Sequence, residues 1–159
     1  MQHGDADAQD YTDSLDQLAA NERAIESLYR EYARQHPAQK GFWLGLASEE
    51  ELHAASIEEL AAAAGHPAAT PSKRFKTEAI RAFTAYVQEQ EEAARRGEVT
   101  FETALTMAYY IETALIERGF FEQLPHHDAD TAKTLTALKS DTERHVSKVI
   151  EARAGLHRP

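Results

Sequence analysis

The chain contains no cysteine among its 159 residues. This absence excludes disulfides, thiolate-ligated metal sites, iron–sulfur clusters and cysteine nucleophiles. Apolar residues never run to the ~20 consecutive positions that a membrane span needs, so we expect no membrane partner. The first residues, MQHGDADAQDYTD, are polar and acidic and do not resemble a signal peptide, and we therefore expect a cytoplasmic protein.

Positive charge is also scarce, with 17 Lys and Arg residues against 27 Asp and Glu residues and a net charge of −10. A nucleic-acid binder needs a basic face, so this balance argues against a nucleic-acid partner. The chain has only 4 Val and 6 Ile residues, which favour strands, but 29 Ala residues, which favour helices. The 7 Gly and 5 Pro residues are few and clustered. This composition predicts an all-α fold.

Proline and glycine divide the chain into a few long helical segments. We expect five helices, over residues 14–35, 42–64, 73–96, 100–123 and 129–154. The residues able to cap the first, fourth and fifth of them are Asp13 or Ser14, Thr100, and Asp128 or Asp130. Residues 1–12 are expected to form a flexible acidic arm, and residues 13–155 a single domain.

Four of these helices carry apolar residues at alternating spacings of three and four, which is typical of a buried helix face. Near the middle of each face the apolar pattern is interrupted by Glu22, Glu50, His53, Glu112 or His145. A buried carboxylate without a partner is costly, and no Lys or Arg falls on these faces. A metal ion is the simplest compensating charge. Carboxylate oxygen and imidazole nitrogen together suit iron, manganese or zinc.

The spacing of these residues sharpens the prediction. Glu50 and His53 are three residues apart, about 60° around a helix, so both side chains can reach one ion. This is the Glu-x-x-His element of di-iron carboxylate bundles. The second half repeats the order, with Glu112 preceding His145 as Glu22 precedes His53. We therefore predict two helical hairpins, joined by a helical crossover over 73–96, in an antiparallel four-helix bundle.

Four short motifs follow one another along the chain. Glu22 is followed seven residues later by Tyr29, and the next helix contains SEEELHAAS. The third motif is AYYIETALIERGFF, which contains Glu112, and the fourth is LKSDTERHVSKVIEA, which contains His145. Together, over residues 14–154, they resemble the ferritin-like superfamily in its rubrerythrin branch, although the fourth motif matches only in part.

The resemblance implies a pair of iron ions that activates dioxygen or peroxide while Fe(II) is oxidised to Fe(III). The catalytic residues and metal ligands that it implies are Glu22, Glu50, His53, Glu112 and His145. Manganese or zinc would also suit these ligands. Because the chain has no cysteine, it lacks the rubredoxin module of rubrerythrins, and an external electron donor is implied.

Two positions depart from the family pattern. Thr142 stands where the family has a ligand Glu, three residues before His145. Asp141 is the best substitute, because it lies within about 40° of His145 around the helix. Its side chain is one methylene shorter than that of a Glu. The second ion is therefore expected to be weakly held, asymmetric or absent. Leu115, on the helix expected over 100–123, replaces a further Glu of the family pattern, three residues after Glu112. This replacement weakens the case for a rubrerythrin-type peroxidase.

Several alternatives remain open at this point. The three Glu side chains would face water if the register were shifted by one, and either His alone could be an ordinary core residue. Thr142 is expected to bond to its own helix backbone rather than to a metal. Tyrosines that either pack in the core or hydrogen-bond to the site are Tyr29, Tyr32, Tyr109 and Tyr110.

The function also has alternatives. A chain with a degenerate site would be a non-catalytic iron-binding protein or a helical interaction protein. A zinc-dependent hydrolase fits less well, because hydrolytic zinc sites use more than one imidazole per ion. We expect a homodimer or larger homo-oligomer, with Trp43, Phe120 and Phe121 as contact residues.

Overall fold

The structure is a computed structural model that describes residues 3–64, 77–97, 99–124 and 128–156. Within these ranges it is helical and contains no strand, which confirms the predicted all-α class. The elements are α1 (His3–Gln35), the short 3₁₀ helix η1 (Pro37–Gln39), α2 (Lys40–Ala63), α3 (Thr77–Arg95), α4 (Phe101–Glu117), the single turn α5 (Phe120–Gln123) and α6 (Ala129–Leu156).

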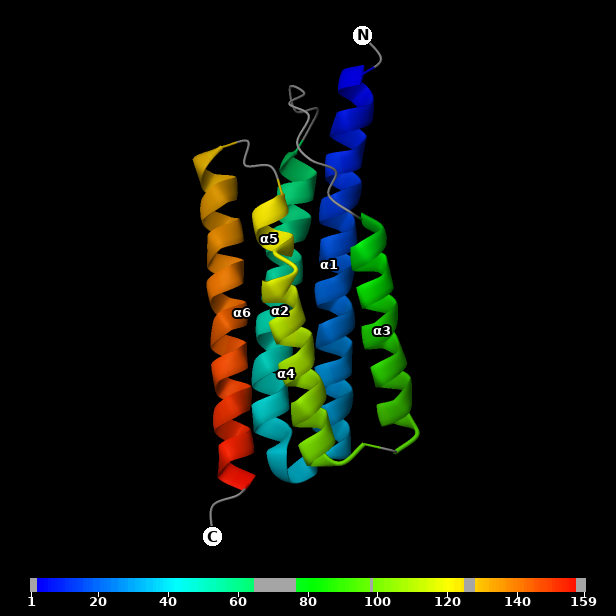
Figure 1. The fold of residues 1–159 in the computed structure, drawn as a ribbon, viewed down its shortest axis with the longest axis vertical. Helices are drawn as coiled ribbons and strands as arrows, with labels where there is room; N and C mark the ends of the chain where they lie inside the picture. Colours follow the sequence, from blue (N-terminus) through cyan, green and yellow to red (C-terminus); the bar gives the residue numbers. More distant parts are fainter. Residues whose placement is uncertain (1–2, 65–76, 98, 125–127, 157–159) are drawn as a thin grey trace.

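The helices form an elongated bundle (Figure 1). Helix α1 packs against α2 and α3, and α4 packs against α6, which also contacts α2. Neighbours α1 and α2 are antiparallel, as are α4 and α6 (Figure 1). Because α3 returns along α1, α2 and α4 run in the same direction. Helix α3 lies on the outer side of α1 (Figure 1) and connects the two hairpins along the chain, where a crossover helix is predicted; residues 65–76 lie outside the described part.

The predicted buried faces are correct in register. On α1 the whole face is buried, namely Leu15, Leu18, Glu22, Ile25, Tyr29 and Tyr32. The polar residues in the middle of the other faces are also buried, so they do not face water as the alternative register would require. Burial of the apolar side chains on these faces stabilises the packed helices by about 25 cal/mol per Å² of apolar surface removed from water. This packing surrounds the polar centre.

Two of the predicted helix caps are confirmed. The Thr100 side chain accepts a hydrogen bond from the backbone N–H of Thr103 at 3.2 Å, at the start of α4. At the start of α6, Asp128 accepts one from the backbone N–H of Thr131 at 2.6 Å. Asp130, the alternative cap, lies inside α6. Each bond satisfies a backbone donor that the first helical turn leaves free.

Two helix boundaries differ from the prediction. Helix α1 begins at His3 rather than at residue 14, so residues 3–12 are helical and neither Asp13 nor Ser14 is a cap. Tyr11 and Ser14 are buried, which extends the packed face of α1 toward its N-terminus. The helix expected over 100–123 is interrupted by Gly119, whose φ of 62° is left-handed and ends α4 before α5 begins.

The predicted subunit contacts are also wrong in one respect. Trp43, Phe120 and Phe121 are 0%, 4% and 2% exposed, because they pack inside the chain, and they cannot form an intermolecular contact as the structure stands. The large apolar side chains that are exposed are Leu52, Tyr110, Ile150 and Leu156. A homodimer or larger homo-oligomer stays a prediction, but Trp43, Phe120 and Phe121 are no longer candidates for its contact residues. No helix in the described part of the chain is both long and apolar enough to cross a membrane.

Candidate metal centre

Five buried side chains from four helices meet in the interior of the bundle. Glu22 comes from α1, Glu50 and His53 from α2, Glu112 from α4, and His145 from α6. Each is at most 4% exposed. All five are residues that the sequence singles out as ligands, so the packing of the helices brings the predicted set together at one place.

The five residues form two groups that share one carboxylate. Glu22, Glu50 and His53 make the first triad, and Glu50, Glu112 and His145 make the second. In each triad one ligand atom from every residue lies within 4.8 Å of the others. The two histidine rings lie parallel to within 23°, with their centroids 5.4 Å apart. With the rings at this spacing, the shared Glu50 carboxylate contacts both imidazoles.

The two oxygens of Glu50 point to different histidines. Oε2 lies 3.0 Å from Nδ1 of His53, and Oε1 lies 2.7 Å from Nδ1 of His145. Glu22 is 3.8 Å from His53 Nδ1, and Glu112 is 3.5 Å from His145 Nδ1. Both histidines therefore turn the same nitrogen, Nδ1, toward the carboxylates.

Several ligand atoms of the triads have no hydrogen-bond partner in the described part of the structure. They are both carboxylate oxygens of Glu22, Oε1 of Glu50, Oε2 of Glu112 and Nδ1 of His145. The Glu50 and His145 atoms are close, but they are not aligned for a hydrogen bond. Buried polar atoms are nearly always paired, so such a concentration of unpaired atoms fits a site built to hold ions.

The outer nitrogen of each histidine contacts a carboxylate outside the triads. Nε2 of His53 lies 3.4 Å from Oδ2 of Asp141, and Nε2 of His145 lies 2.9 Å from Oε2 of Glu49. A carboxylate at the outer nitrogen orients the ring and leaves the inner nitrogen free to bind a metal. Glu49 also pairs with Lys148, and with Arg144 at 3.2 Å.

Sequence reasoning missed Glu49. It precedes Glu50, so it lies off the buried face of α2, and its side chain is 28% exposed. Its contact with His145 joins residues 96 positions apart and depends on how α2 and α6 pack. No spacing within either helix predicts such a contact.

The structure places Asp141 outside both triads. Its side chain is 33% exposed, and its Oδ1 accepts a hydrogen bond from Arg144 at 2.5 Å. Thr142, at the position of the missing Glu, is buried and donates its hydroxyl to the Leu138 carbonyl at 3.0 Å, as the sequence predicts. At this position of α6, three residues before His145, the structure therefore has a back-bonded hydroxyl and no carboxylate.

Of the four tyrosines singled out from the sequence, Tyr29 contacts the triads. Its hydroxyl donates to Oε1 of Glu112 at 2.6 Å. Tyr32 is buried against Trp43, with ring centroids 4.9 Å apart, and belongs to the core. Tyr109 is half-buried beneath Arg153, and Tyr110 is exposed. Tyr29 therefore holds one oxygen of Glu112 in place.

Burial and neighbouring charges shift the ionisation of the site. Burial, together with the nearby Glu50 carboxylate, raises the pKa of Glu22 to about 8. Burial lowers the pKa of His53, but Glu22 and Glu50 outweigh it and raise that pKa to about 10. Likewise burial opposes, but Glu112 and Glu50 raise, the pKa of His145 to about 11. Both imidazoles are therefore protonated on both nitrogens near pH 7, and their positive charges partly neutralise the carboxylates.

Proton release is the expected accompaniment of metal binding. A metal ligand must be an unprotonated imidazole nitrogen or an ionised carboxylate, so each ion displaces about one proton from His53 or His145, and the ion of the first triad also displaces the proton of Glu22. The apparent affinity for Zn²⁺ should therefore rise between pH 6 and pH 8, because fewer protons compete at the higher pH. Titration calorimetry at pH 7 in buffers of different ionisation enthalpy measures the number released. Heats that do not depend on the buffer would show that neither imidazole gives up its proton.

In comparisons with protein-family models, curated protein sequences and solved structures, no match to this chain was found.

Proposed function

We propose that the chain is a ferritin-like, rubrerythrin-like protein that holds two metal ions, taken to be iron, and oxidises Fe(II) or reduces peroxide or dioxygen there. The observation that carries this proposal is Glu50, a buried carboxylate shared by two triads. A carboxylate whose two oxygens each lie close to a different imidazole could serve two neighbouring ions at once.

The order of the helices supports the ferritin-like part of the proposal. In each hairpin the first helix supplies a lone Glu, and these are Glu22 on α1 and Glu112 on α4. The second helix supplies a His, and these are His53 on α2 and His145 on α6. This division of ligands among four helices is the pattern of di-iron carboxylate bundles, except that α6 has Thr142 in place of the Glu of its Glu-x-x-His element.

Each residue then has a distinct task. Glu50 would bridge the ions, while Glu22 and Glu112 would each bind one of them. His53 and His145 would bind through Nδ1, because Asp141 and Glu49 face their other nitrogens. Iron, when bound, supplies one-electron changes between Fe(II) and Fe(III). Manganese would also fit this set, and zinc would bind without redox chemistry.

The charges of the site favour unequal binding affinities for the two ions. The three carboxylates carry a charge of −3 against +4 for two divalent ions. At Thr142 a hydroxyl that bonds to Leu138 takes the place of a fourth negative charge. The second triad, whose His145 follows Thr142 by three residues on α6, should therefore hold its ion less tightly. Electrons for repeated turnover would come from a separate donor, because the chain has no cysteine to hold a redox iron.

The arrangement of Thr142 also favours a second candidate, an iron-binding protein without turnover. If the second triad binds its ion too weakly, one ion is held and no two-electron reduction of the oxidant follows. The number of ions bound per chain separates the two functions.

Loss of the shared carboxylate should abolish the paired site. We expect Glu50→Ala to bind at most one Fe(II) per chain and His53→Ala to lose the ion of the first triad, while helicity stays largely unchanged. Metal content after anaerobic Fe(II) loading and desalting gives the stoichiometry, with circular dichroism as the check of folding. Glu51→Ala is the matched control, because Glu51 is an exposed neighbour paired with Arg30 at 2.9 Å. Unchanged metal content in both site variants would place the metal elsewhere.

Restoring a carboxylate at Thr142 should strengthen the second ion. We expect Thr142→Glu to raise the second-ion affinity by about tenfold, ~1.4 kcal/mol, because it adds a charged ligand next to the second triad. The same variant should lower the Tm of the metal-free protein, since it buries another carboxylate. Thr142→Gln has the same shape without the charge. Equal second-ion affinities for the Glu and Gln variants would contradict the proposed cause of the asymmetry.

A further inference from the structure

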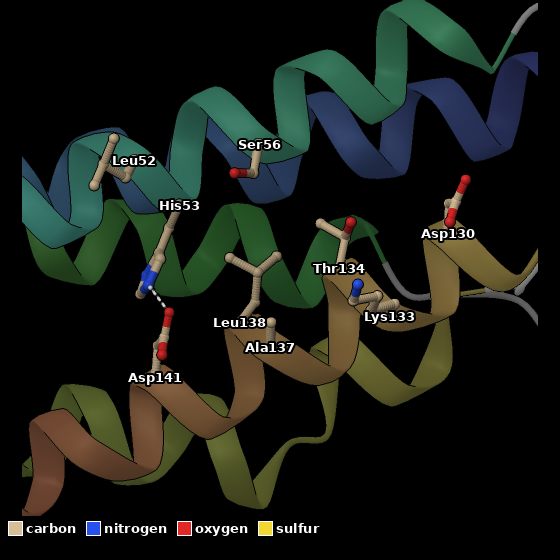
Figure 2. A pocket seen from close by; sticks show the side chains of 9 residues that line it. All are labelled: Leu52, His53, Ser56, Asp130, Lys133, Thr134, Ala137, Leu138 and Asp141. Carbon is tan, nitrogen blue, oxygen red and sulfur yellow. Dashed lines mark hydrogen bonds and ion pairs between the residues drawn. The ribbon is translucent and has the colours of Figure 1, made fainter.

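A groove of about 480 Å³ lies between α2 and α6, beside the first triad (Figure 2). Its walls include Ser56 and His53 from α2 and Thr134, Ala137 and Asp141 from α6. His53 and Asp141 face one another across one end of it, and Asp130 and Lys133 lie toward the other end (Figure 2). We call it the α2–α6 groove.

His53 separates this groove from the buried carboxylates. Its Nε2 lies on the side of Asp141, at 3.4 Å, and its Nδ1 lies on the side of Glu50, at 3.0 Å. The His53 side chain is only 5% exposed. Behind it both oxygens of Glu22 are buried without a hydrogen-bond partner. His53 therefore belongs both to the wall of the groove and to the first triad.

The second triad is covered on its outer side. His145 is fully buried, and its Nε2 is capped by Glu49, which Lys148 and Arg144 hold in place. Glu112 is likewise fully buried and hydrogen-bonded by Tyr29. An ion approaching from this side would have to break the ion pairs of Glu49. The two triads thus differ in their access to solvent.

We propose that divalent cations enter through the α2–α6 groove, bind first to Asp141, and pass His53 to fill the first triad before the second. This inference rests on the proposed metal site. Oδ1 of Asp141 is held by Arg144 at 2.5 Å, whereas Oδ2 has only the longer contact with Nε2 of His53 at 3.4 Å, so Oδ2 is the oxygen that an incoming ion would take over. Hydroxyls of Ser56 and Thr134 in the groove offer further oxygen ligands, as cations that shed water require.

The charged residues that line the groove are balanced, because Asp130 and Asp141 occur together with Lys133 and the protonated imidazole of His53. Asp130 and Lys133 lie toward one end (Figure 2), so the carboxylate beside the first triad is that of Asp141, which lies 3.4 Å from Nε2 of His53. A carboxylate is a ligand for divalent cations and not for anions. In this account Asp141 is a transient ligand on the path, which agrees with its position outside both triads.

The test compares binding rates in two pairs of matched variants. Asp141→Asn removes the charge from the groove, and Glu143→Gln removes one from an exposed position two residues later on α6. Ala137→Phe fills the groove, and Thr136→Phe puts the same ring on the neighbouring exposed residue, which does not line it. Metal-free protein is mixed rapidly with Co²⁺. Quenching of Trp43, the only tryptophan, reports binding, because its ring centroid lies 5.6 Å from that of Tyr29.

We expect Asp141→Asn and Ala137→Phe to slow Co²⁺ association by about tenfold, and both controls to stay within about twofold of the unmodified chain. The number of Co²⁺ ions bound at equilibrium should be the same in all of them. Rates equal to those of the controls would show that ions enter elsewhere and would overturn the inference while leaving the metal site standing. Loss of a bound ion in Asp141→Asn would make Asp141 a resident ligand and would also overturn it. If the unmodified chain bound no Co²⁺, the proposed site itself would fail.

Discussion

The contacts of the buried Glu50 carboxylate with the imidazoles of His53 and His145 are the interactions around which the polar centre of the bundle is arranged. Two further carboxylates, Glu22 and Glu112, lie beside Glu50 in an interior that is largely apolar. Such a group of buried charges is unfavourable unless protons or metal ions compensate it. Protonated imidazoles provide part of that compensation, as their raised pKa values indicate. Two metal ions would provide it more completely.

The fold makes this concentration of charge possible. Four long helices each contribute their buried face, and the return of α3 along α1 lets α2 and α4 run in the same direction. The triads then lie in the interior with helical turns above and below them, so apolar packing on both sides stabilises the polar centre. The two halves are not equivalent, because Thr142 gives the second triad no further carboxylate while Asp141 gives the first triad a charged neighbour at the groove.

Much of this architecture follows from periodicity in the sequence. The positions of Glu22, Glu50 and Glu112 within apolar faces predict their burial, because a helix places residues three and four apart on one side. The caps Thr100 and Asp128 are predictable for a similar reason, since their side chains act within the adjacent turn. Local rules therefore account for the helices and for the residues that meet at their centre.

The features that the sequence does not predict depend on contacts between helices. The helix extends N-terminally to His3 and buries Tyr11, and the break at Gly119 needs a left-handed backbone that glycine allows but does not enforce. Aromatic residues such as Trp43 are equally suited to a core and to an interface, so their burial cannot be read from residue type. The contact between Glu49 and His145 and the position of Asp141 depend on how α2 and α6 are set against each other.

The central claim is that this bundle holds a pair of redox-active ions. The most direct measurement is absorbance on adding air or peroxide to protein loaded anaerobically with Fe(II), together with the iron content per chain. We expect two irons per chain and a new near-ultraviolet band that is typical of an oxidised di-iron carboxylate centre. One iron or none, with no spectral change on adding either oxidant, would contradict it.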